Sequence, residues 1–281
     1  MTLHLNSTGG LGNQLFQIAA LLEAADRLQV DKHIRFKSTG KTLRTFDSSD
    51  LLESLGISLC TFRCKSEFRK KIYIQNEGDF QKFNSISDHT FMSGYFQDSD
   101  YNRNSRRKIL NAITSNYKSC CENDQDRNIQ TVAIHLRIGD YALDKTNFKF
   151  HGVLSEEYYE NAIQLVKKTS RIENIYIFSD TPDQAQAKID RITSRINPQI
   201  SVKFGGCKNN NLICEMFRLG SFDNLIMSNS SFSWWAGALR IRNSTIGPTR
   251  WYRDDKMQSS NPMLKGWHKV NNSFEGEVNF T

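Results

Sequence analysis

The feature that most constrains the fold is a regular alternation of short apolar strands and amphipathic helices between residues 129 and 248. The expected strands are rich in β-branched residues and are separated by segments with apolar residues at helical spacing. They cover residues 129–136, 174–180, 201–204, 224–229 and 244–248. This alternation predicts a parallel sheet with helices on both faces, which is a Rossmann-like domain.

The helices between these strands carry recognisable end signals. The clearest follows Ser155, which can cap it, with Glu156 and Glu157 in its first turn and Lys167 and Lys168 in its last. That order of charges suits the helix dipole. The other helices are expected at residues 181–196, 213–219 and 231–242.

The opening of the chain predicts a second unit of the same kind. Residues 2–6 alternate like a short strand, residues 7–14 form a Gly-rich turn, and apolar residues recur at helical spacing from Leu15. Asn13 suits the N-cap of that helix. Between residues 30 and 125 only a strand running into a loop, at 89–101, is predicted.

These patterns together predict an α/β protein with two Rossmann-like domains that face a cleft. The N-terminal domain is expected at residues 1–126 and the C-terminal domain at 127–281. We expect substrates beyond the C-terminal ends of the strands, where open parallel sheets bind their ligands.

The net charge of +7 is compatible with nucleic acid, an anionic membrane surface or a phosphorylated substrate. No zinc-finger spacing, RNA-binding motif or basic helix points to nucleic acid, which we exclude as a partner. No run approaches the roughly 20 apolar residues of a transmembrane helix, and the first residues lack the pattern of a signal peptide. We therefore expect a cytoplasmic protein, with contact to the membrane surface as an option, and six free thiols.

The first loop that could carry chemistry is the Gly-rich turn. Gly10 and Gly12 would let the backbone approach a ligand closely, and Asn13 and Gln14 place two amides at a helix start. The third glycine of a dinucleotide motif is replaced by Leu15, and the lysine of a P-loop is absent. A tight turn with no ligand is the alternative interpretation.

The second loop follows the strand at residues 129–136. Arg137 and Asp140 would leave the sheet at its C-terminal edge, next to His135. Arginine binds phosphate in a bidentate manner, so this loop indicates phosphate binding. The alternative is a surface arginine that is merely paired with Asp140.

The third loop holds Ser230, Ser231 and Ser233 at the start of a helix, where free N–H groups and the helix dipole favour an anion. Trp234 and Trp235 lie inside that helix and are expected to pack it onto the sheet. The second and third loops would converge on a diphosphate, as in a nucleotide-sugar site. We expect no Asp-x-Asp pair that could bind a metal, and no metal is expected.

The three loops resemble those of the bacterial α-1,2-fucosyltransferases, glycosyltransferase family eleven. The resemblance rests on GGLGNQLFQ, HLRIGDY and SNSSFSWWAGAL, with weaker matches at GYFQ, HGVLSEEYY, FSD and GPTRWY. It implies a GT-B architecture of two Rossmann-like domains with the donor in the second. It also implies metal-independent transfer of L-fucose from GDP-β-L-fucose to the 2-hydroxyl of a galactose, with inversion.

The resemblance also implies roles for single residues. Arg137 would hold the donor diphosphate with His135 beside it, and Asn13 would face the reacting centre. The remaining donor-binding residues would be Gly10, Gly12, Gln14, Ser230, Ser231, Phe232 and Ser233.

The proton acceptor is left open among Asp140, Asp144, Asp98 and the leaving phosphate. The expected partners are a galactose-terminated or lipid-linked glycan and the inner-membrane surface. A non-catalytic sugar-binding protein and a transferase with another donor remain as alternatives.

Overall fold

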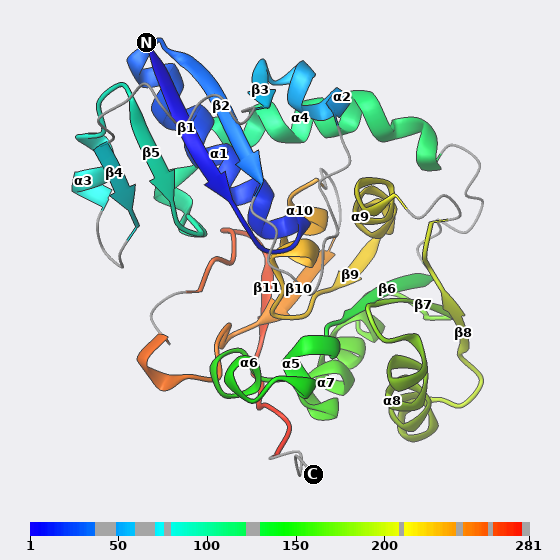
Figure 1. The fold of residues 1–281 in the computed structure, drawn as a ribbon. Coiled ribbons are helices and arrows are strands. Elements are labelled where there is room, and N and C mark those ends of the chain that lie inside the picture. Colours follow the sequence, from blue (N-terminus) through cyan, green and yellow to red (C-terminus); the bar gives the residue numbers. More distant parts are fainter. Residues whose placement is uncertain are drawn as a thin grey trace. The chain divides into compact units, whose positions relative to one another are not determined.

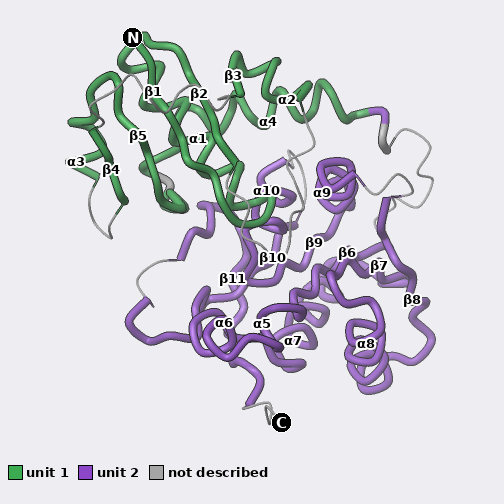
Figure 2. Tube along the Cα trace, in the orientation of Figure 1, with its two compact units in different colours: residues 1–118 green, residues 119–281 purple. Residues whose placement is uncertain are grey.

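A computed structural model describes residues 1–36, 49–59, 71–75, 80–121, 130–207, 211–239, 244–257 and 261–276. The chain divides into two compact units, residues 1–118 and residues 119–281 (Figure 2). The predicted domain boundary at residues 126 and 127 lies outside the described residues.

Unit 1 is built on a parallel sheet with the strand order β3-β2-β1-β5-β4 (Figure 1). Its strands are β1 (Thr2–Ser7), β2 (Asp31–Phe36), β3 (Ile57–Leu59), β4 (Lys71–Ile74) and β5 (Thr90–Ser93). Its helices are α1 (Leu11–Leu28), α2 (Ser49–Ser54), α3 (Phe80–Asn84) and α4 (Ser105–Tyr117), with the short 3-10 helix η2 (Ser99–Tyr101) before α4. A second 3-10 helix, η3 (Lys118–Cys121), crosses the boundary between the two units. The order reverses between β1 and β5, which makes this the switch point of the sheet.

The predicted cap of α1 is wrong. The helix begins at Leu11, its N-cap is Gly10 in an extended conformation, and the Gln14 N–H donates to the Gly10 carbonyl at 3.0 Å. Asn13 therefore lies in the first turn. The helix starts earlier because Leu11 is itself buried, at 6% exposure, and belongs to the apolar face.

Unit 2 is built on a second parallel sheet, with the order β11-β10-β9-β6-β7-β8. Its strands are β6 (Thr131–Leu136), β7 (Asn174–Ser179), β8 (Ser201–Phe204), β9 (Asn224–Ile226), β10 (Ser244–Pro248) and β11 (His268–Val270). Counted from β6, this is the Rossmann order, with the switch point between β6 and β9. The predicted strands are confirmed, except that β9 ends at Ile226 and β11 was not predicted.

The helices of unit 2 cover both faces of this sheet (Figure 1). They are α5 (Gly139–Leu143), α6 (Lys145–Phe150), α7 (Glu156–Lys167), α8 (Pro182–Ile196), α9 (Leu212–Ser221) and α10 (Ser231–Ala238), with the 3-10 helix η4 (Asp255–Met257). Alternate residues of β7 show the two faces. Ile175 and Ile177 pack in the core with α7 and α8, whereas Tyr176 and Phe178 contact Phe222 after α9.

The predicted end signals of α7 are confirmed. Ser155 is the N-cap and accepts a hydrogen bond from the Tyr158 N–H, with Glu156 and Glu157 in the first turn. The double tryptophan of α10 is core, as predicted, with Trp234 at 1% and Trp235 at 0% exposure.

None of the helices in the described part of the chain has the length and hydropathy needed to span a membrane. The expectation of free thiols is correct for Cys207 and wrong for Cys214, which forms a disulfide. The sequence could not show this disulfide, because two cysteines can form one only where the fold brings their Cα atoms within about 7 Å.

Candidate functional site

The loops after β6 and β9 carry most of the predicted donor-site residues of unit 2. The two strands are neighbours, with Ile134 opposite Ile226. Their C-terminal ends therefore reach the same edge of the sheet, on either side of the switch point, where Rossmann folds bind ligands. The two loops therefore start side by side, while their convergence on a diphosphate stays a prediction.

Arg137 is held by two carboxylates. Its Nη2 lies 2.6 Å from Asp140 Oδ1 and its Nη1 lies 2.7 Å from Asp180 Oδ2. The guanidinium carbon also stands 5.2 Å from the centre of the Tyr141 ring. The pairing with Asp140 that we considered as the alternative is thus present. The ion pairs with Asp140 and Asp180 do not use all five N–H donors of the Arg137 guanidinium. Arg137 is therefore a fixed cation, 30% exposed, that can still bind an anion.

Asp180 is a site residue that the sequence reasoning missed, although its motif, FSD, was noted. It follows β7, and its Oδ1 accepts a hydrogen bond from the Ile138 N–H at 3.3 Å. Its carboxylate therefore fixes both the backbone and the side chain of the Arg137 loop. The sequence did place Asp180 at the end of a predicted strand, and this position could have indicated a site residue.

Gly139 leaves the room that Asp180 occupies. A Cβ added at position 139 would overlap the carboxylate of Asp180. We expect Gly139→Ala to lower the free energy of unfolding by about 1–3 kcal/mol, the usual cost of overpacking. Urea denaturation measures this, with Gly206→Ala as the matched control, because a Cβ at Gly206 meets no heavy atom within 4 Å. Equal stability of the two variants would contradict the assigned packing.

His135 is the last buried polar residue before the Arg137 loop. Its Nδ1 lies 2.7 Å from Ser228 Oγ, and its ring centre lies 5.5 Å from that of Phe232. These two contacts join the end of β6 to the segment after β9. Burial lowers the pKa of His135 to about 3, with the charge of Arg137 adding to the effect and that of Asp180 opposing it. The imidazole is therefore neutral in the folded protein near pH 7.

The buried histidine predicts a specific loss of stability in acid. Burial also lowers the pKa of His151 to about 4. In the unfolded chain these histidines have the ordinary pKa of about 6.5, so they bind protons at a higher pH than in the folded protein. The unfolding free energy therefore decreases as the pH falls below about 6.5, and these two groups do not change it above that pH. We expect His135→Asn to reduce the slope of the unfolding free energy between pH 6 and pH 4 by about 1.4 kcal/mol per pH unit. Urea denaturation at each pH measures the slope; parallel curves for the two proteins would contradict the neutral, buried state.

The turn before α10 is held by its own serines. Ser230 is the N-cap and accepts a hydrogen bond from the Phe232 N–H at 3.3 Å. The hydroxyl of Ser233, which is fully buried, donates to the carbonyls of Ser228 and Ser230. Ser231 and Phe232 are partly exposed. Their position makes these two residues the ones in this turn that could contact a ligand.

Asn229 was also missed. Its side chain is buried, and its Nδ2 donates to the carbonyls of His151, Gly152 and Trp251 at 2.9, 3.3 and 3.1 Å. One amide therefore ties the turn before α10 to two other segments of unit 2. The sequence shows Asn229 within a polar cluster, but it does not show what the amide reaches.

In unit 1, the Gly-rich turn lies at the switch point between β1 and β5. Gly9 has a φ of +82°, and the Gln14 Nε2 donates to its carbonyl at 2.9 Å. The Oδ1 of Asn13 accepts from Gln97 Nε2 at 2.8 Å, which brings the GYFQ segment to this turn. The amide of Gln17, another residue without a predicted role, bonds Ser7 and both backbone groups of Thr8.

The predicted residues thus gather within each unit. His135, Arg137 and Asp140 share an edge with the turn at residues 228–233 in unit 2, and Gly10, Gly12, Asn13 and Gln14 share a turn in unit 1. Their roles toward substrate stay predictions.

The expectation that no Asp-x-Asp pair is present is wrong, because the sequence holds two, Asp98/Asp100 and Asp124/Asp126. The second pair lies outside the described residues. The Asp100 N–H donates to Asp98 Oδ1 at 3.0 Å, and the Asp100 carboxylate pairs with Arg103. Within the described ranges, no group of three or more His, Cys, Asp and Glu side chains is arranged to hold a metal ion.

A model of the family described as Glycosyl transferase family 11 matches residues 1–271. The alpha-1,2-colitosyltransferase of Escherichia coli is 25% identical over 286 residues, covering 93% of this chain and 96% of that protein. The O-antigen biosynthesis glycosyltransferase WbnK of Escherichia coli is 27% identical over 299 residues, covering 87% of this chain and 93% of that protein.

Among solved structures, NodZ alpha-1,6-fucosyltransferase soaked with GDP-fucose is similar with a TM-score of 0.53 and 12% identity, covering 85% of this chain and 92% of that chain. The likeness confirms the predicted architecture of two Rossmann-like domains of the GT-B type.

Proposed function

We propose, because the chain belongs to glycosyl transferase family 11, that it moves L-fucose from GDP-β-L-fucose to the 2-hydroxyl of a terminal galactose. The observation that carries the proposal is the Arg137 guanidinium, which two carboxylates orient at the switch point of unit 2. A fixed cation at the carboxyl ends of parallel strands suits the diphosphate of a nucleotide sugar. The solved structure of NodZ soaked with GDP-fucose supports this class of donor.

Inversion at the anomeric carbon requires stabilisation of the leaving GDP. Arg137 and the positive end of the α10 helix dipole would supply positive charge where negative charge develops. Ser231 and Phe232 would contact the donor directly. Ser230 and Ser233 would support it through the turn that they hold.

The acceptor hydroxyl must lose a proton as it attacks. Asp140, whose side chain is 50% exposed, would orient Arg137 and could take that proton, the leaving phosphate being the alternative acceptor. We assign the turn of unit 1 to the substrates as well, with Asn13 at the reacting centre and Gly10, Gly12 and Gln14 shaping the loop.

A second candidate donor is GDP-L-colitose, which lacks the 3-hydroxyl of fucose. It is favoured by the similarity to an alpha-1,2-colitosyltransferase over nearly the whole chain. The two donors differ by one hydroxyl. A site that hydrogen-bonds that hydroxyl would reject the deoxy sugar strongly, whereas a site without such a partner would accept both.

A transfer assay tests the proposal. The purified protein is incubated with GDP-fucose or GDP-colitose, a panel of β-galactosides and EDTA, and the product linkage is read by NMR. We expect a new α1-2 linkage to galactose, formed without added metal. Transfer that requires a metal ion, or transfer to another position, would contradict the proposed reaction.

Two further outcomes separate the alternatives. Binding of galactosides without turnover of either donor would indicate a non-catalytic sugar-binding protein. Turnover only with another nucleotide sugar would indicate a different donor. The similarity to the O-antigen biosynthesis glycosyltransferase WbnK supports a role in O-antigen assembly. The acceptor that we propose is a galactose-terminated, lipid-linked glycan. We propose that the protein meets such an acceptor at the cytoplasmic face of the inner membrane.

A further inference from the structure

Residues 272–275, which we call the strap, run along a segment that ends in the donor site. Leu154 and Phe274 form an antiparallel bridge, the Ser155 N–H donates to the Ser273 carbonyl at 3.0 Å, and the Glu275 N–H donates to the Val153 carbonyl at 2.8 Å. The strap thus adds a short strand-like partner to residues 153–155. The match to the family model ends at residue 271, so the strap lies beyond it.

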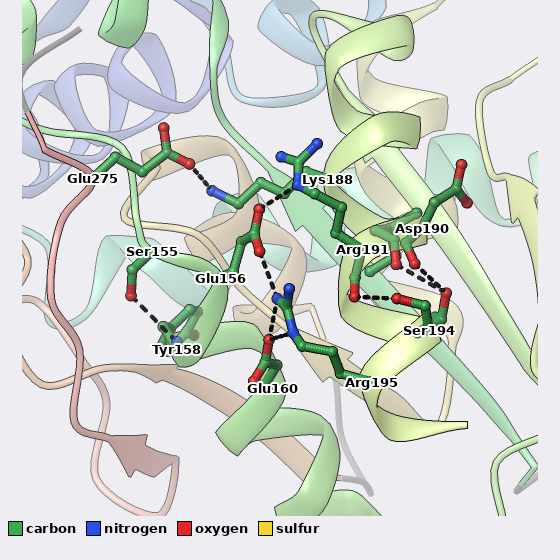
Figure 3. A network of polar contacts seen from close by, with 12 residues as sticks. Ser155, Glu156, Tyr158, Glu160, Lys188, Asp190, Arg191, Ser194, Arg195 and Glu275 are labelled. Carbon is green, nitrogen blue, oxygen red and sulfur yellow. Dashed lines mark hydrogen bonds and ion pairs between the residues drawn. The ribbon is translucent and has the colours of Figure 1, made fainter. Parts of the chain in front are cut away.

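A buried lysine fixes the strap to the body of unit 2. Lys188 of α8 is 2% exposed, and its Nζ donates to the Leu154 carbonyl at 2.5 Å and pairs with the Glu275 carboxylate (Figure 3). One ammonium therefore bonds both the strap and the segment beneath it. Burial lowers the pKa of Lys188, while the charge of Glu275 opposes that effect.

An ion pair whose ammonium is buried, with a carboxylate that is 35% exposed, is a poor way to gain stability, since desolvation of the ammonium offsets most of the attraction. Its best-attested use is to fix the register of the parts that it joins. The ion pairs that join α7 to α8 provide a contrast. Arg191 and Arg195 pair with Glu156 and Glu160, and both arginines are about half exposed (Figure 3). These pairs join two helices and do not include the strap.

The segment under the strap continues into the Arg137 site. Gly152 has a φ of +68°, and a Cβ there would lie 2.6 Å from Phe274 of the strap. The ring of the preceding residue, His151, stacks on Tyr141, with ring centres 4.5 Å apart and planes within 2°. Tyr141 in turn faces the guanidinium of Arg137. The chain of contacts therefore runs from Lys188 to Arg137.

We propose that Lys188 and Glu275 are positioning residues of the donor site. By fixing the strap on residues 153–155, they keep His151 stacked on Tyr141 and thereby set the guanidinium of Arg137 toward the donor diphosphate. This inference rests on the proposed function, because it assigns Arg137 to the diphosphate of a GDP-sugar.

The test compares Lys188→Met with Arg195→Met. Both variants remove a cation of α8 that pairs with a glutamate, but only the first touches the strap. We expect Lys188→Met to weaken GDP binding, measured by calorimetry, by at least about fivefold, the lower end of typical coupling between sites. The KM for the donor should rise while the KM for the acceptor stays unchanged. Arg195→Met should bind GDP as the unmodified protein does.

Hydrogen exchange of the Ser155 amide gives a readout that needs no ligand. It should speed up in Lys188→Met and not in Arg195→Met, because only the first loosens the bond from Ser155 to Ser273. Glu275→Gln, which keeps an acceptor for Lys188, should lie between Glu275→Ala and the unmodified protein in GDP affinity. Glu275 is 35% exposed, so these two variants serve if Lys188→Met does not fold.

The outcomes separate the two proposals. If the unmodified protein binds no GDP, the proposed function fails, and the exchange rates still decide whether Lys188 holds the strap. If Ser155 exchanges faster but GDP affinity is unchanged, the strap is held as described but does not position the donor site, and the inference is overturned. Unchanged exchange in folded Lys188→Met and Glu275→Ala overturns it as well.

Discussion

Replacing Arg137 with alanine is expected to lower kcat by about 10²–10³-fold, the usual effect of removing one preorganised group that stabilises developing charge. The reason lies in its surroundings: Asp140 and Asp180 hold the guanidinium in one place, so the charge needs no reorganisation when GDP departs. Steady-state kinetics with saturating donor and acceptor measure the change. Circular dichroism checks that the variant is folded.

Two controls make the Arg137 result specific. Arg137→Ala also leaves the Asp180 carboxylate, only 15% exposed, without its partner. The double variant Arg137→Ala/Asp180→Asn removes that charge, and it should be as inactive as the single variant. Arg137→Lys keeps the charge but not the planar fork, and it should recover only part of the rate. Near-normal turnover in Arg137→Ala would remove this residue from the donor site.

Replacing Trp235 with alanine is expected to cost about 3–5 kcal/mol of unfolding free energy, as large-to-small changes of buried aromatic residues do. Trp235 is fully buried in α10, and its ring centre lies 5.2 Å from that of Trp234. The cavity would form under the helix that presents Ser231 and Phe232. The loss of stability should therefore be accompanied by weaker donor binding.

Fluorescence can follow this change in one unit alone. All four tryptophans, Trp234, Trp235, Trp251 and Trp267, belong to unit 2, and Trp235→Ala retains three of them. Urea denaturation followed by their emission should show an earlier transition. Phe204→Ala is the matched control, since Phe204 is 47% exposed and its loss leaves no cavity. If both variants unfold at the same urea concentration, the core role of Trp235 is contradicted.

Most of unit 2 was predictable because its signals are local. β6 and β7 are buried on both faces and are therefore continuous apolar runs, and the cap at Ser155 lies next to the helix that it starts. β11 was missed because its residues are mostly exposed, so no apolar pattern marks it. The same reason hid β3 and β4 at the two edges of the sheet in unit 1.

The residues of the candidate site could be named from the sequence, whereas the partners that hold them could not. A strand end followed by arginine is visible in the sequence, whereas Asp180, which holds that arginine, lies 43 residues further along. The bond between Asn13 and Gln97 spans 84 residues. Only the order of the strands brings such pairs together. Asn13 itself shows the limit of local reasoning, since a residue suited to a cap lies within the first turn because Leu11 is buried.

The strap has a consequence for how boundaries of this protein are chosen. A shortened chain that ends where the family model ends, at residue 271, would contain every sequence motif discussed here. It would also leave the ammonium of Lys188 buried beside the Leu154 carbonyl without its counter-charge from Glu275. A chain that contains all the motifs can thus lack the few residues that complete the structure around Lys188. A preparation trimmed to the residues that match the family model would lack the contacts by which we propose that the strap positions the donor site.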